Sequence, residues 1–132
     1  MNKNSTDYSF LNKCSKEELI FFIKQAGWFR QTFYYTDVLS RRWKIKSDQL
    51  AAKQKRHHEN FKSLDLEYRG RLAGKFNNES DIKKKLSILE EMEGYEKKFN
   101  QWVEAGKRLR REEKKVDKLY AELNREYDKR QN

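Results

Sequence analysis

The sequence predicts an all-α protein, a long antiparallel helical hairpin of coiled-coil type with a short N-terminal helix. Three observations support this fold class. Proline is absent and glycine occurs only 5 times in 132 residues, so few positions interrupt a helix. Hydrophobic residues make up 36% and charged residues 39%, a balance too polar for a compact core. Aromatic residues make up 14%, which argues against disorder and favours paired helices around a thin core.

The first predicted helix has a recognisable start. Ser15, followed by Glu18 and then Leu19, has the pattern of a capping box, which opens a helix. Gly27 is the expected end. We therefore expect a flexible segment and then one helical domain. The predicted boundaries are 1–14 for the flexible segment, 15–132 for the domain, 15–26 for the short helix, 28–73 for the first long helix, 74–80 for a turn, and 81–128 for the second long helix.

The predicted turn rests on clustered helix breakers. Gly70, Gly74, Asn77 and Asn78 lie within nine residues and form the only grouped turn signal beyond the N-terminal segment. Their position, midway between two long helical stretches, predicts that the chain folds back on itself there. Two chains intertwined as a homodimer would satisfy the same pattern and remain an alternative.

The second long helix carries a heptad pattern, with seam positions separated alternately by four and three residues. Ten of its twelve positions are apolar, which is typical of a coiled-coil seam. The positions are Ile88, Met92, Tyr95, Phe99, Trp102, Gly106, Leu109, Glu113, Val116, Tyr120, Leu123 and Tyr127. A weaker seam runs along the first long helix, and folding at the turn brings the two seams together. The expected pairs are Leu64 with Met92, Phe61 with Tyr95, His57 with Phe99, Leu50 with Gly106, Trp43 with Glu113, and Phe33 with Leu123.

The positive charge is concentrated in two segments. Residues 41–56 carry a charge of +6 and residues 107–118 carry +4, which together equal the net charge of +10. The basic residues are Arg41, Arg42, Lys44, Lys46, Lys53, Lys55 and Arg56 in the first segment, and Lys107, Arg108, Arg110, Arg111, Lys114, Lys115 and Lys118 in the second. The expected pairing sets Arg41 and Arg42 level with Lys114 and Lys115. We therefore predict one basic band that binds nucleic acid or another acidic partner.

Aromatic residues flank this predicted band and would stack on bases if they were exposed. They are Trp28, Phe29, Tyr34, Tyr35 and Trp43. The alternative is that these aromatics form core and that the lysines and arginines are solvated helix formers.

The sequence offers little support for a catalytic site or a metal site. His57 and His58 are adjacent, so their side chains diverge by about 100° on a helix and cannot share a metal as an i, i+4 pair would. Cys14 is the only cysteine and has no histidine near it in sequence. The carboxylates of Glu90, Glu91 and Glu93 have no expected cleft around them. We expect no enzyme activity, no metal, no cofactor and no small-molecule substrate.

The longest apolar run, residues 19–23, is only five residues long, far too short to cross a bilayer. The lone Cys14 suits a reducing compartment, so a cytoplasmic location is expected. Five consecutive apolar residues also exceed what one buried helix face needs. Either this helix is buried on several sides or part of it docks a partner.

These patterns predict a non-enzymatic helical protein that engages nucleic acid, or a protein already holding nucleic acid, through the basic band. One alternative is a phage or mobile-element inhibitor or adaptor that contacts a host protein through the aromatic N-terminal third. A CRISPR effector nuclease would be such a target, making the chain anti-CRISPR-like. The other alternative is a structural coiled coil whose charges only keep it in solution.

Overall fold

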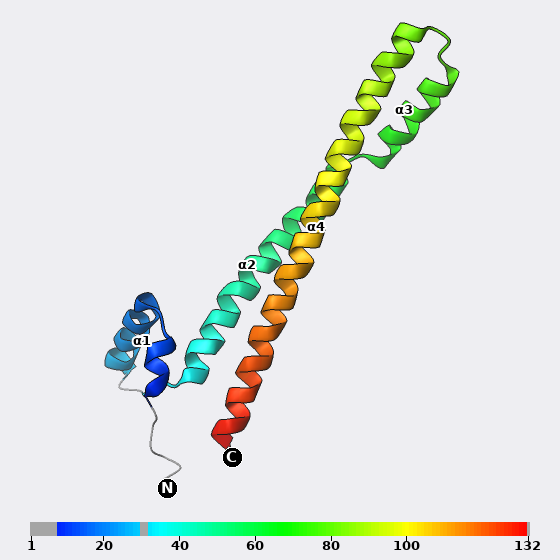
Figure 1. The fold of residues 1–132 in the computed structure, drawn as a ribbon. Helices are drawn as coiled ribbons and strands as arrows, with labels where there is room; N and C mark the ends of the chain where they lie inside the picture. The colour runs from blue at the N-terminus through cyan, green and yellow to red at the C-terminus, as the bar shows by residue number, and fades with distance from the viewer. Residues whose placement is uncertain (1–7, 30–31, 132) are drawn as a thin grey trace. The chain divides into compact units, whose positions relative to one another are not determined.

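The computed structural model describes residues 8–29 and 32–131, and gives the backbone alone for residues 28 and 29. Helices account for 91% of the described residues, and none of these residues lies in a strand. The elements are a 3-10 helix η1 at Ser9–Lys13, α1 at Lys16–Phe29, α2 at Tyr35–Ser63, α3 at Leu66–Asn78, and α4 at Ile82–Gln131 (Figure 1). The predicted all-α class is confirmed.

The chain divides into two compact units, which are described separately. The first unit comprises Met1–Asp48 and Lys114–Asn132, and the second comprises Gln49–Glu113. Helices α2 and α4 contribute residues to both units, whereas α3 belongs wholly to the second. In each unit, side chains of α2 contact side chains of α4, so α2 and α4 form the predicted antiparallel pair.

The first unit contains an apolar cluster that holds η1 and α1 against α2. Phe10, Phe22 and Val38 are its buried members, and Phe33 and Tyr35 pack against them. The rings of Phe22 and Phe33 are stacked with their centroids 5.2 Å apart. Within the segment predicted to be flexible, residues 9–13 form η1, and burial of Phe10 stabilises it. Residues 1–7 lie outside the described part of the chain.

The capping box that opens α1 is present as predicted. The Ser15 N–H donates to Glu18 Oε1 at 2.9 Å, and the Glu18 N–H donates to Ser15 Oγ at 3.1 Å. Within the apolar run that follows, only Phe22 is buried, while Ile20 is 44% and Ile23 is 61% exposed. The run is therefore not covered on several sides, at least by the described residues.

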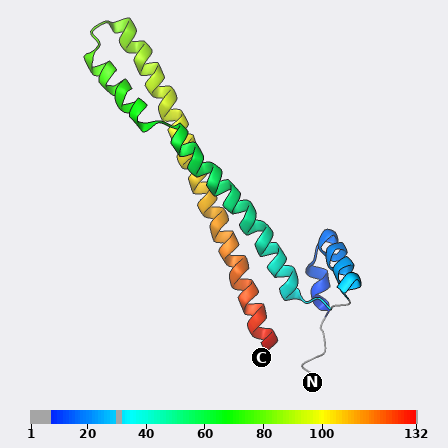
Figure 2. The ribbon, with the colours of Figure 1, turned by 180° about the vertical axis from the view of Figure 1, so that it is seen from behind.

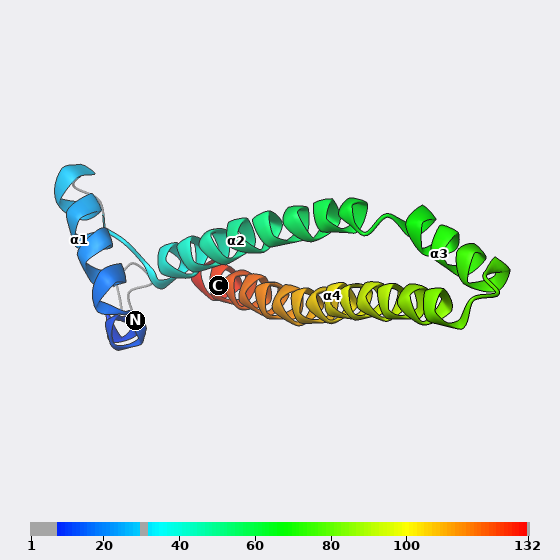
Figure 3. The same ribbon diagram turned by 90° about the horizontal axis from the view of Figure 1, so that it is seen from above.

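The first long helix, predicted over 28–73, is interrupted twice. Residues 32–34 are not helical, and α2 ends at Ser63 before a second break at Leu64 and Asp65, visible in Figure 3. Asp65 has a left-handed conformation with φ of 47°, and its side chain accepts a hydrogen bond from the Tyr68 N–H. Aspartate tolerates this conformation better than most residues and caps α3 at the same time.

The turn is shorter and later than predicted. The sequence places it over 74–80, whereas only residues 79–81 separate α3 from α4 (Figure 2). Gly70 and Gly74 lie inside α3, where glycine is tolerated at a cost of about 1 kcal/mol relative to alanine. Asp81 begins α4 by accepting a hydrogen bond from the Lys83 N–H.

The predicted pairing of α2 with α4 is wrong by one heptad. Phe61 packs on Trp102 rather than Tyr95, and Trp43 packs on Tyr120 rather than Glu113. Each contact thus falls seven residues later on α4 than predicted, in the same direction as the later turn. The shift replaces the unfavourable Trp43–Glu113 pair with an aromatic one.

The second unit shows why the shifted pairing fits. The ring of His57 lies so close to Gly106 that an added Cβ would meet His57 Cε1 at 3.1 Å. His57 also stacks on Trp102, with ring centroids 4.3 Å apart and an interplanar angle of 7°. His57 Nε2 donates to the Trp102 carbonyl at 2.8 Å, and Trp102 Nε1 donates to the His57 carbonyl at 2.8 Å. Gly106 therefore makes room for His57, not for Leu50.

The seam residues of α4 are buried to different degrees. Tyr95 in the second unit is 6% exposed and Leu123 in the first is 5% exposed. Leu109 and Val116 are half-buried. Most of the predicted seam is therefore buried or half-buried, whereas its members Glu113, Tyr120 and Tyr127 are exposed.

Candidate nucleic-acid interface

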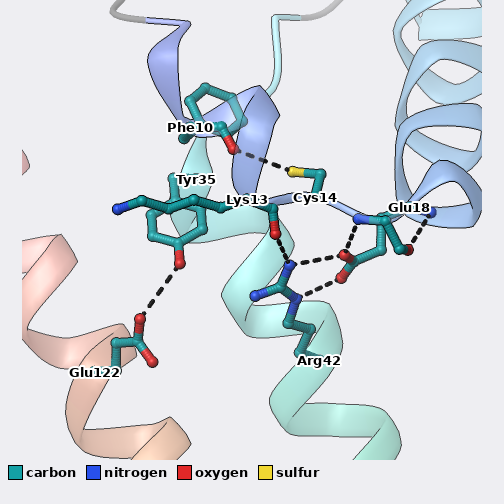
Figure 4. A network of polar contacts seen from close by, with 8 residues as sticks. Phe10, Lys13, Cys14, Glu18, Tyr35, Arg42 and Glu122 are labelled. Atoms are coloured by element: carbon teal, nitrogen blue, oxygen red, sulfur yellow. Dashed lines mark hydrogen bonds and ion pairs between the residues drawn. The ribbon is translucent and has the colours of Figure 1, made fainter.

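Arg42, predicted to belong to the basic band, instead holds α1 to α2 in the first unit. Its Nε donates to Glu18 Oε2 at 2.6 Å and its Nη2 donates to Glu18 Oε1 at 2.8 Å. The same Nη2 donates to the Lys13 carbonyl at 2.6 Å (Figure 4). The Glu18 side chain is only 9% exposed, so the pair is largely shielded from solvent.

The electrostatics of this pair are strong. The hydrogen bonds from Arg42 lower the pKa of the Glu18 carboxyl to about 2, and the bond from Ser15 adds to this effect. The bond to Glu18 raises the pKa of Arg42 further above its ordinary value. Arg42 is therefore neutralised by its neighbour and is not free to bind a phosphate.

Arg41 is also occupied within the first unit. Its guanidinium lies over the ring of Phe21, 4.2 Å from the centroid, and the residue is half-buried. The α4 segment that packs near it is set by the Trp43–Tyr120 contact and by the Tyr35 hydroxyl, which donates to Glu122. The predicted alignment of Arg41 and Arg42 with Lys114 and Lys115 is therefore wrong, as the shifted pairing requires.

The described aromatic residues that were predicted to contact bases instead contact other residues of the first unit. The ring of Tyr34 lies under the guanidinium of Arg130, 4.2 Å from the centroid. Tyr35 and Trp43 are half-buried, and desolvation together with Glu122 raises the pKa of Tyr35. The side chains of Trp28 and Phe29, the other two predicted contacts, lie outside what the structure describes. Tyr34, Tyr35 and Trp43 are therefore half-buried and engaged in contacts within the first unit.

Two predicted lysines of the second unit have acidic partners. Lys53 Nζ donates to Glu112 Oε1 at 3.1 Å, and Lys107 Nζ donates to Glu104 Oε1 at 3.1 Å. Both pairs are exposed, so each contributes little stability. The remaining basic residues of the two segments are exposed and form no ion pair within residues 8–29 and 32–131. They are Lys44, Lys46, Lys55, Arg56, Arg108, Arg110, Arg111, Lys114, Lys115 and Lys118.

Six exposed basic residues of α4 fall into two groups of three, one in each unit, and we call these six residues the α4 basic face. They are Lys107, Arg108 and Arg111 in the second unit, and Lys114, Lys115 and Lys118 in the first. At about 100° per residue, the three residues of each unit fall within an arc of about 100° of their helical segment. All six are exposed, as are Glu113 and Asp117, whereas Leu109, Glu112 and Val116 are half-buried. By their helical spacing, Glu112, Glu113 and Asp117 fall outside the arcs of the basic residues.

The sequence contains a signal for these two groups of residues. Residues 107, 108 and 111, and again residues 114, 115 and 118, have the spacing of residues on one side of a helix. The predicted band rested instead on the pairing of residues 41–56 with residues 107–118. The remaining predicted cations, on α2, are spread around that helix and mix with Asp48 and Glu59.

Other chemistry is scarce in the described part of the chain. No group of three or more metal-binding side chains occurs among the described residues. The Cys14 thiol donates to the Phe10 carbonyl at 3.6 Å, and burial followed by the nearby Glu18 charge raises its pKa. A raised pKa leaves little thiolate, so Cys14 is a poor nucleophile. None of the described helices is long and apolar enough to span a membrane.

Comparisons with known proteins add no assignment. No family model, curated protein or solved structure matches this chain.

Proposed function

We propose that this chain is a non-enzymatic helical protein that binds nucleic acid, free or held by another protein, through the α4 basic face. One observation carries the proposal: in each unit, three exposed cations share one arc of α4 with no acid between them. Only Lys107 of the six has an acidic partner among the described residues. A cytoplasmic location, where nucleic acid is accessible and Cys14 stays reduced, belongs to the same proposal.

The physical basis is charge repulsion and its relief. In each unit the helix rises about 6 Å from the first to the last of its three cations, which is less than the Debye length of about 8 Å, so these positive charges repel one another at physiological salt. Such a concentration opposes folding unless an anion offsets it. A phosphate backbone neutralises these side chains and releases condensed counterions, which drives binding.

A matched pair of triple variants tests the proposal. Replacing Arg111, Lys114 and Lys115 with glutamine should weaken binding to nucleic acid by about 10- to 100-fold at about 0.15 M salt, because three phosphate contacts are lost. Fluorescence anisotropy with a labelled oligonucleotide measures this loss.

The control is Lys75→Gln, Lys83→Gln and Lys84→Gln, which removes the same charge from exposed positions near the α3–α4 turn. It should change binding by no more than about threefold. Equal losses in both variants would show that only net charge matters, and no loss in either would refute the proposed interface.

A protein-directed inhibitor or adaptor, of the kind encoded by phages or mobile elements, is the second candidate. The exposed side chains of Ile20 and Ile23 on α1 favour it, because exposed apolar residues on one helix face are suited to a protein contact. The double variant Ile20→Asn, Ile23→Asn tests this candidate. If this variant loses the protein's biological activity while the triple α4 variant keeps it, a protein contact through α1 replaces nucleic-acid binding as the proposed function.

A further inference from the structure

We infer that the α4 basic face binds double-stranded nucleic acid, reading the phosphate backbone and not the bases. The inference rests on the proposed function and narrows its ligand class. It follows from what the basic face contains, from how the neighbouring aromatic side chains are held, and from the charge density of the two possible ligands.

The first observation concerns the composition of the surface. Between residues 103 and 119 of α4 the sequence contains no aromatic residue and no histidine. The exposed side chains of the α4 basic face are lysines and arginines alone. Proteins that grip single strands combine a basic groove with aromatic side chains on which the bases stack. This face supplies the charge without the stacking surface.

The second observation concerns the aromatic residues at either end of that stretch. In the second unit, Trp102 is half-buried and its ring stacks on His57. Its indole N–H donates a hydrogen bond to the His57 carbonyl. In the first unit, Tyr120 packs on Trp43 with ring centroids 5.3 Å apart. Tyr120 is 48% exposed, but it follows Lys118 by two residues and so lies about 160° away from Lys118 around the helix. Both the ring and the indole N–H of Trp102 are thus engaged in contacts with His57. A base could stack there only after the His57–Trp102 contact had opened.

The charge density of the ligand also distinguishes a duplex from a single strand. Without stacking, affinity comes from phosphate contacts, which favour the ligand with more charge per unit length. A duplex carries about one charge per 1.7 Å of axis, so the three cations of each unit, within about 6 Å of helix rise, can lie along about three to four phosphates. Counterion release per contact is also greater for a duplex than for a single strand. Closely spaced cations without a stacking surface therefore suit a duplex.

The test uses the whole chain and four labelled probes of about 24 base pairs or nucleotides, longer than the basic face. The probes are duplex DNA, duplex RNA, oligo(dT) and oligo(rU). We expect at least one duplex to bind about tenfold or more tightly than its single strand at ~0.15 M salt. Two duplexes of unrelated sequence should bind within about threefold of each other, because base edges are not read. The DNA and RNA arms identify which duplex is preferred.

The outcomes separate the two proposals. Single strands that bind as tightly as duplexes, or more tightly, would overturn the inference while leaving nucleic-acid binding intact. A large difference between duplex sequences would also overturn it. If no probe binds, the proposed function itself fails. Replacing Arg111, Lys114 and Lys115 with glutamine should remove the duplex preference, and a far-ultraviolet circular dichroism spectrum like that of the unmodified chain shows that the variant is folded.

Discussion

Glu18 connects three parts of the first unit through its carboxylate. It accepts two hydrogen bonds from Arg42 of α2 and one from the Ser15 backbone, which starts α1. Arg42 in turn bonds the Lys13 carbonyl at the end of η1. A charge so shielded is stable only while its partner is present, because an unpaired carboxylate or guanidinium would have to give up its hydration.

We therefore expect Glu18→Gln to lower the free energy of unfolding by about 2–3 kcal/mol. The loss arises because the Arg42 guanidinium is left shielded without its counter-charge. Denaturant unfolding at neutral pH measures it. Glu17→Gln is the matched control, since Glu17 is exposed and forms no ion pair with any described residue. A Glu18→Gln loss no larger than that of Glu17→Gln would contradict the contact.

The same carboxyl makes the first unit sensitive to acid. The pKa of Glu18 is lowered to about 2 in the folded chain and is about 4.3 in an unfolded one, so the unfolded state takes up a proton first as pH falls. The stabilisation is complete above about pH 5 and disappears between about pH 4.5 and 2. We expect Glu18→Gln to flatten the stability profile in this window. An unchanged profile would mean that other carboxyls dominate.

Some contacts of single residues could be predicted from the sequence, and others could not. The sequence identified Arg41 and Arg42 as part of the charge excess, which is correct as a count. Their partners, Phe21 and Glu18, belong to another helix, and no local pattern indicates which cations will be neutralised across such a contact. The capping box at Ser15 was predictable because both of its partners are local.

At the scale of the helices, the heptad pattern does not specify a unique pairing of α2 with α4. A heptad seam repeats every seven residues, so a slip of one heptad again sets apolar side chains against apolar side chains. The turn selects among these pairings, and the turn is poorly specified when glycines also lie within a helix, as Gly70 and Gly74 do. The long helices were therefore predictable, whereas their pairing was not.

Gly106 provides a direct test of the observed pairing. Glycine to alanine within a helix normally stabilises a protein by about 0.5–1 kcal/mol. At Gly106 the new Cβ would lie 3.1–3.3 Å from the His57 ring, which is fixed by its stack on Trp102. Gly94 on the same helix has nothing within 4 Å of an added Cβ. We expect Gly94→Ala to stabilise and Gly106→Ala to destabilise the chain, with a difference of at least about 1 kcal/mol. Equal stabilisation by both would mean that His57 does not face Gly106.

The break between α2 and α3 was missed for a related reason. Neither glycine nor proline marks it; Asp65 adopts the left-handed conformation and caps α3 with its own side chain. Aspartate signals helix starts at many positions, and an exposed one among charged neighbours is not distinctive. Such a break moves side chains of α3 without changing the overall helical composition, which is why the fold class was still predicted correctly.

For the whole molecule, the sequence predicted where the positive charge lies along the chain but not how it is presented. Segment 107–118 keeps six of its seven cations exposed in the α4 basic face, and only Lys107 of the six has an acidic partner, Glu104, among the described residues. Segment 41–56 loses Arg41 and Arg42 to internal contacts and distributes the rest around α2. Exposure and neutralisation decide which charges can meet a partner, and both depend on tertiary contacts. Association into a homodimer stays a prediction that no observation here tests.

The salt dependence of binding tests the α4 basic face most directly. A slope of log Kd against log salt reports the phosphates neutralised, at about 0.9 per contact on a duplex. We expect a slope of about 4–5 for the unmodified chain, lowered by about 2–3 when Arg111, Lys114 and Lys115 become glutamine. The Lys75, Lys83 and Lys84 variant should keep the original slope. Equal slopes for the unmodified chain and the α4 variant would contradict phosphate binding by this face.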